Sequence, residues 1–126
     1  MKNYPESTTI PAMIDHGLSE RQLNLIRDLI REFAPGVKSV SLFGSRATNS
    51  HRSYSDIDMV LYGDVKEDAV DRLWTCFNES SLPYKVDLVA YHLINYPPLK
   101  AHIDRFAKTL FSTDQLADRQ SAEKEL

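Results

Sequence analysis

The sequence has one cysteine and no long apolar run, and each of these features excludes a class of protein. The single cysteine, Cys76, cannot form an internal disulfide, so we expect a protein of a reducing compartment, the cytoplasm. No apolar run approaches the roughly 18 residues that a membrane-spanning helix needs, and residues 1–7 lack the apolar core of a signal peptide. The length of 126 residues fits one domain with a core of its own.

Positive charge is also scarce. The chain carries 15 Lys and Arg against 18 Asp and Glu, a net charge of −3. Extended binding to nucleic acid needs a basic surface, so the charge argues against it and against a template-using polymerase, while a local basic patch stays open. Apolar residues make up 42% and charged residues 26%, which is ordinary for a soluble globular domain.

Helical and alternating patterns predict an α/β fold of the α+β kind, a sheet backed by helices. The best-marked helix is expected from Leu18 to Ala34, where Ser19 and Gln22 form a capping box. The remaining expected elements are strands at 37–43, 56–62 and 84–91, helices at 66–78 and from 99 to 106, and a short apolar piece at 109–111. We predict an irregular lead-in at 1–17, the domain at 18–112 and a polar, flexible tail at 113–126.

Three aspartates lie in or beside the expected strands. Asp56 and Asp58 open one strand and point the same way, about 7 Å apart. Two carboxylates on one face repel each other unless a cation such as Mg²⁺ joins them. Asp87 interrupts another, otherwise apolar strand, and three such acids can hold two metal ions about 3.5–4 Å apart.

A Gly-Ser turn precedes the first pair of acids. Gly44 and Ser45 end a strand and offer backbone N–H groups and a hydroxyl to an anion, typically a phosphate. The Ser45 hydroxyl could also cap the next helical turn, and both uses share one geometry. The sequence thus places a phosphate cradle and a carboxylate pair on consecutive strands.

Gly44-Ser45, ten residues, then Asp56-x-Asp58, with Asp87 downstream, resembles the DNA polymerase β nucleotidyltransferase superfamily. The sequence motifs Leu-Phe-Gly-Ser-Arg-Ala and Ser-Asp-Ile-Asp resemble those of its minimal nucleotidyltransferase (MNT) branch. The resemblance implies a small mixed sheet flanked by helices, with Asp56, Asp58 and Asp87 as catalytic and metal-binding residues. It also implies that the nucleotide binds at the following positions: Gly44, Ser45 and Arg46. Exposure to solvent is the alternative for Arg46.

MNT proteins of this size are typically antitoxins paired with a helical HEPN ribonuclease toxin. The resemblance implies that AMP passes from ATP to a tyrosine hydroxyl of that partner, with two Mg²⁺ ions (Mn²⁺ also suits oxygen ligands). A homodimer or hetero-oligomer is expected. The alternatives are an antitoxin that only binds its partner and a small-molecule adenylyltransferase.

Several residues near the motif carry open interpretations. Relatives often have glycine in the loop after the Gly-Ser turn, so Asn49, or Asn49 together with Ser50, is expected to take any left-handed turn here. Tyr54 either stacks on a base or packs on the domain. His102 has no metal-ligand spacing and is read as structural or exposed. Tyr91 and Tyr96 form either a partner surface or part of the core.

Overall fold

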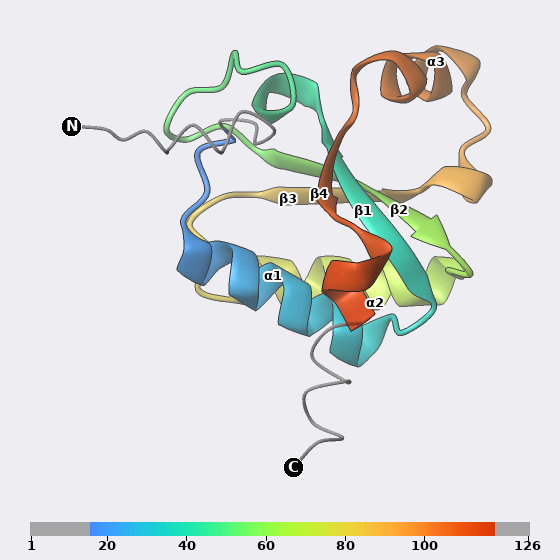
Figure 1. The fold of residues 1–126 in the computed structure, drawn as a ribbon, viewed down its shortest axis with the longest axis horizontal. Coiled ribbons are helices and arrows are strands. Elements are labelled where there is room, and N and C mark those ends of the chain that lie inside the picture. Colours follow the sequence, from blue (N-terminus) through green and yellow to red (C-terminus); the bar gives the residue numbers. More distant parts are fainter. Residues whose placement is uncertain (1–15, 118–126) are drawn as a thin grey trace.

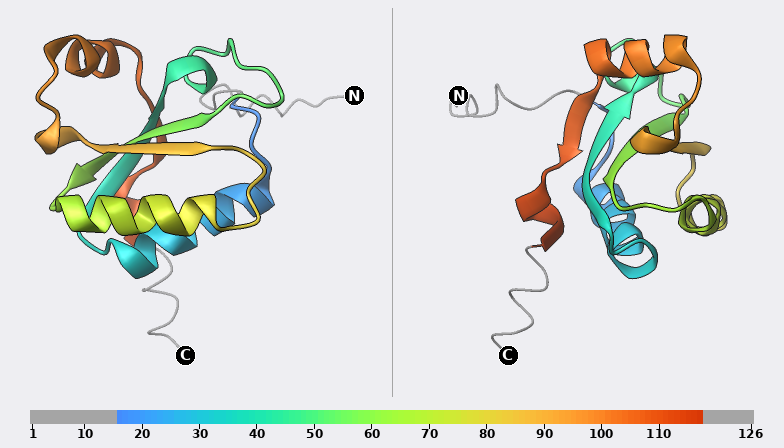
Figure 2. Two further views of the ribbon diagram at one scale, coloured as in Figure 1. Left: turned by 180° about the vertical axis from the view of Figure 1, so that it is seen from behind. Right: turned by 90° about the vertical axis from the view of Figure 1, so that its right-hand side faces the viewer.

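The computed structural model describes residues 16–117, and the first fifteen positions of the expected lead-in lie outside them. A four-stranded sheet has the order β3-β2-β1-β4, with α1 and α2 side by side beneath it and α3 above it (Figures 1 and 2). The elements are α1 (Glu20–Phe33), β1 (Val37–Phe43), η2 (Gly44–Arg46), β2 (Ile57–Gly63), α2 (Glu67–Asn78), β3 (Val86–Ala90), η3 (Tyr91–Leu93), α3 (Pro97–Phe106) and β4 (Lys108–Phe111).

The sheet is mixed, as the resemblance implied. Strand β1 runs antiparallel to β2 and β4, whereas β2 and β3 run parallel. The predicted 37–43 strand is β1 itself, and the predicted 84–91 strand is shortened to β3. The predicted 56–62 strand begins one residue later, so Asp56 stands just before β2.

Helix α1 starts as the sequence predicts. The Gln22 N–H donates to the Ser19 hydroxyl at 3.1 Å, and the Ser19 N–H donates to the Gln22 side chain at 2.9 Å. These bonds satisfy two of the donors that a helix start leaves unpaired. On the face toward the sheet, Ile26 and Ile30 are fully buried. Burial of each such side chain contributes about 1.5–3 kcal/mol.

Alternation along β2 divides the molecule into two sides. Ile57, Met59 and Leu61 point into the core shared with α1 and α2. Between them, Asp58 and Val60 point to the other side of the sheet, where α3 lies. Because the side toward α1 and α2 is filled with apolar side chains, polar chemistry is confined to the side of α3.

The expected tail differs from the structure in its first residues. Residues 113–117 are helical, and Leu116 is buried in the main core. The Ser112 and Gln115 side chains each accept from the other's backbone N–H, at 3.3 and 2.8 Å, in a second capping box. The flexible tail cannot therefore begin at residue 113, and its predicted remainder, 118–126, lies outside the described residues. Within the described part of the chain, no helix could span a membrane.

Candidate active site

The parallel pairing of β2 and β3 places two of the predicted acids next to each other. Asp58 lies opposite Asp87 in the strand register, so both carboxyl groups point to the α3 side of the sheet. Both side chains are half-buried, whereas Asp56 is exposed at the start of β2. The fold thus brings Asp58 and Asp87 together from positions 29 apart in the sequence.

The electrostatics of Asp58 show the cost of this pairing. Burial, then the charges of Asp87 and Asp56, and a hydrogen bond to Asp87 raise the pKa of Asp58 to about 6, against an ordinary 3.8. Lys85 acts in the opposite direction. A carboxyl group that resists ionisation beside like charges marks a place where added positive charge is favourable.

Gly44 lies against the same carboxyl group. Its φ is +76°, and a Cβ added there would stand 2.4 Å from the Asp58 Oδ2 atom. Any other residue would strain the backbone and push the carboxylate away. The glycine therefore lets the turn Gly44–Arg46 pass directly beside Asp58, and Ser45 follows it half-buried.

The donor set at this place suits a hard divalent cation. Carboxylate oxygens are the ligands that Mg²⁺ prefers, usually together with phosphate oxygens. Within residues 16–117, however, no three His, Cys, Asp or Glu side chains are grouped closely enough to hold a metal ion. The metal-binding role of Asp56, Asp58 and Asp87 stays a prediction.

The structure does not support the expected nucleotide contact of Arg46. Its side chain is only 1% exposed, and the guanidinium lies 4.5 Å from the centroid of the Tyr84 ring. It donates to the carbonyl oxygens of Ser55, at 2.8 Å, and His16, at 2.7 Å. Because these carbonyls and the ring occupy the guanidinium, Arg46 holds the loop and the segment before α1 together.

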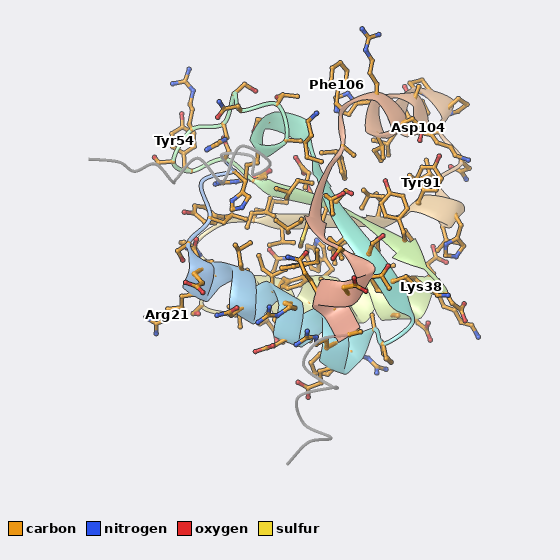
Figure 3. The ribbon with its side chains drawn as sticks, viewed as in Figure 1. Arg21, Lys38, Tyr54, Tyr91, Asp104 and Phe106 are labelled. Carbon is orange, nitrogen blue, oxygen red and sulfur yellow. The ribbon has the colours of Figure 1, made fainter. Side chains whose placement is uncertain are left out.

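The loop between η2 and β2 follows the predicted path in one respect. Asn49 has a φ of 60° and makes the left-handed turn that glycine would otherwise make. Tyr54 is 72% exposed, which excludes packing of its ring on the domain, and nothing within residues 16–117 places this ring beside the acids. Figure 3 shows it projecting away from the sheet on the side of the loop.

An aromatic cluster beside the turn was not predicted from the sequence. Phe43 pairs with Asp58 across β1 and β2, so both side chains share a face. The His102 ring lies 6.5 Å from the Phe43 ring and 5.1 Å from the Phe106 ring, centroid to centroid. Strand alternation could have placed Phe43 next to the acids, but the approach of α3 depends on tertiary packing.

A half-buried carboxyl pair beside a Gly-Ser turn on a mixed sheet defines a class of nucleotide-handling proteins. The family described as polymerase beta, nucleotidyltransferase matches residues 24–116, most of the chain. The chain belongs to this polymerase beta nucleotidyltransferase family.

Among curated relatives, the chain is similar to the "Probable protein adenylyltransferase MntA" of Haemophilus influenzae, with 32% identity over 74 residues. That match covers 57% of this chain and 64% of the relative, just under two thirds of its length. A solved toxin–antitoxin with AMP-PNP shares the fold at a TM-score of 0.62 and 25% identity, covering 82% of this chain and 86% of that one. A tri-AMPylated Shewanella oneidensis HEPN toxin in complex with its MNT antitoxin gives a TM-score of 0.56 at 24% identity, with 82% and 84% covered, and supports the fold.

Proposed function

We propose that this chain is the antitoxin of an MNT/HEPN pair and transfers AMP from ATP to a tyrosine hydroxyl of its toxin. The observation that carries the proposal is the Asp58–Asp87 carboxyl pair beside the Gly44–Ser45 turn. Family membership supports nucleotidyl transfer. The adenylyltransferase relative and the toxin–antitoxin with AMP-PNP support the nucleotide and the kind of partner.

In this mechanism the turn binds the β and γ phosphates of ATP. The first N–H groups of a helical turn have no partner within it, so those after Gly44 are available to phosphate oxygens. Asp56, Asp58 and Asp87 would hold Mg²⁺, which supplies positive charge to the triphosphate. The half-buried position of Asp58 and Asp87 limits the water that could compete with the acceptor.

The transfer itself forms one bond and breaks another. The acceptor oxygen attacks the α-phosphorus, the bond from that phosphorus to the α,β-bridging oxygen breaks, and pyrophosphate leaves. The proton of the acceptor hydroxyl passes to a carboxylate, and Asp87, opposite Asp58 in the strand register, is the candidate.

The test is transfer of label to a protein partner. The full chain, α-labelled ATP and Mg²⁺ are incubated with the protein encoded beside its gene, which the proposal expects to be of the HEPN type. We expect label on the HEPN protein and loss of its ribonuclease activity. An Asp56→Asn, Asp58→Asn double variant should transfer no label. The control is Asp64→Asn, an exposed carboxylate at the other end of β2.

Two results would contradict the proposal. No label on the partner, with a correctly folded chain, would exclude protein adenylylation. Inhibition of the ribonuclease by the double variant, as strong as by the wild type, would indicate an antitoxin that acts by binding alone.

A further inference from the structure

The aromatic cluster of α3 has no role in the mechanism above. Phe43, immediately before the Gly-Ser turn, contacts His102 edge-on at an interplanar angle of 77°. His102 in turn lies against Phe106 at 44°. The rings therefore form a continuous row from the strand that carries the phosphate-binding turn to the end of α3.

The row ends in a ring that the domain leaves open. The Phe106 side chain is 38% exposed, and Figure 3 shows it at the top of the molecule, at the end of α3. The Arg105 guanidinium lies 5.3 Å from its centroid. Because Arg105 is itself exposed, a flat ligand can displace it or stack beside it.

On the opposite side of the turn, residues 16–117 form no comparable row of contacting rings. There the buried Arg46 guanidinium binds the carbonyl oxygens of Ser55 and His16 and closes the space between the loop and the start of α1. The exposed ring on that side, Tyr54, projects away from the sheet (Figure 3). A nucleoside bonded to an α-phosphate near Asp58 would therefore lie toward α3.

We propose that His102 and Phe106 form the stacking subsite for the purine base of the bound nucleotide. The proposal rests on the function above, because it takes the triphosphate to lie at Gly44 and Ser45. Stacking on aromatic rings favours large flat bases without hydrogen-bond readout, so the subsite prefers purines to pyrimidines through contact area. Phe106 is then a specificity-determining residue of the reaction.

The test measures binding alone. Calorimetric titrations with Mg²⁺ use three probes: inorganic tripolyphosphate, α,β-methylene-ATP, which cannot be cleaved at the reacting bond, and its cytidine counterpart. Wild-type protein should bind the adenosine probe more tightly than the other two. Phe106→Leu should lower the affinity for the adenosine probe by roughly tenfold, as expected for the loss of one stacked ring. The affinity for tripolyphosphate should stay unchanged.

The matched control is Tyr54→Leu, which removes an exposed ring on the other side and should change no affinity. Equal binding of the adenosine probe by wild type and Phe106→Leu would overturn the proposal and leave the phosphate site intact. A wild type that binds adenosine and cytidine probes equally would also overturn it, without any variant. Absence of binding for all three probes would overturn the proposed function and, with it, this subsite.

Discussion

At the scale of single residues, the ionised carboxylate of Asp58, which the proposed reaction needs, lowers the stability of the folded protein. Its folded-state pKa of about 6 exceeds the ordinary 3.8, so the group contributes full stability only below pH 3.8 and loses it as pH rises through 6. Converted into free energy of unfolding, this difference in pKa corresponds to about 3 kcal/mol. Solvent screening of a half-buried carboxyl reduces the expectation to about 1 kcal/mol.

Asp58→Asn should therefore stabilise the protein by about 1 kcal/mol at pH 7.5 and abolish transfer. The gain should shrink as pH falls toward 4, because the wild-type carboxyl is then protonated as well. Urea unfolding at pH 7.5, 5.5 and 4 checks this, with Asp64→Asn as the control. Saturating Mg²⁺ should stabilise the wild type more than the variant. A gain independent of pH would show that the charge is not its cause.

Arg46 offers the clearest contrast between two roles for one residue. If it holds the loop to the segment before α1, Arg46→Met removes a donor to the half-buried carbonyl oxygens of Ser55 and His16. We expect a loss of about 2–3 kcal/mol in the free energy of unfolding. The control is Arg52→Met, in the exposed part of the loop, which should change stability little.

The same pair of variants separates the two readings of Arg46. A binding role would instead lower the affinity for Mg²⁺ and tripolyphosphate without changing stability. A normal melting curve with weakened phosphate binding would contradict the structural role.

The sequence predicts the role of a residue best when its interaction partners lie close to it along the chain. The capping box of Ser19 and Gln22 is local and was predicted. The second one, at Ser112 and Gln115, has the same spacing and could have been found. Arg46 differs, since its acceptors lie 9 and 30 residues away and no local pattern records them.

At the scale of elements, alternation predicted the strands, but their neighbours came from the fold. That Asp87 stands beside Asp58 follows from the parallel pairing of β2 and β3, which strand patterns alone do not specify. The resemblance to a family supplied the expectation that these acids form one site. The position of α3 over the acid-bearing side remained beyond reach, because one amphipathic helix can pack on either face of a sheet.

The helical segment at 113–117 gives a prediction about an element. Leu116 is 7% exposed and its carbonyl accepts from Arg31 at 2.6 Å, so the segment is part of the folded domain. Leu116→Ala should cost about 2 kcal/mol of unfolding free energy. Leu93→Ala removes the same atoms from a side chain that is 46% exposed and should cost much less. Equal effects would indicate a frayed tail, as the sequence suggested.

At the scale of the whole molecule, one core joins the elements that carry the site. The main cluster of buried residues extends from Leu18 to Leu116 and includes side chains of α1, α2 and all four strands. The acids and the Gly44–Ser45 turn are fixed to this core by β1, β2 and β3. Unfolding of any strand would therefore disperse the site, so binding and folding should be linked.

This linkage predicts how ligand changes stability. With Mg²⁺, α,β-methylene-ATP at 100 times its Kd should raise the free energy of unfolding by about 2.7 kcal/mol. Calorimetry and circular dichroism should show a single transition that moves as a whole, because one core supports the site. The Asp56→Asn, Asp58→Asn double variant should melt in one transition that the ligand does not move. A ligand-induced shift confined to part of a two-step melt would show that the site belongs to a separate folding unit.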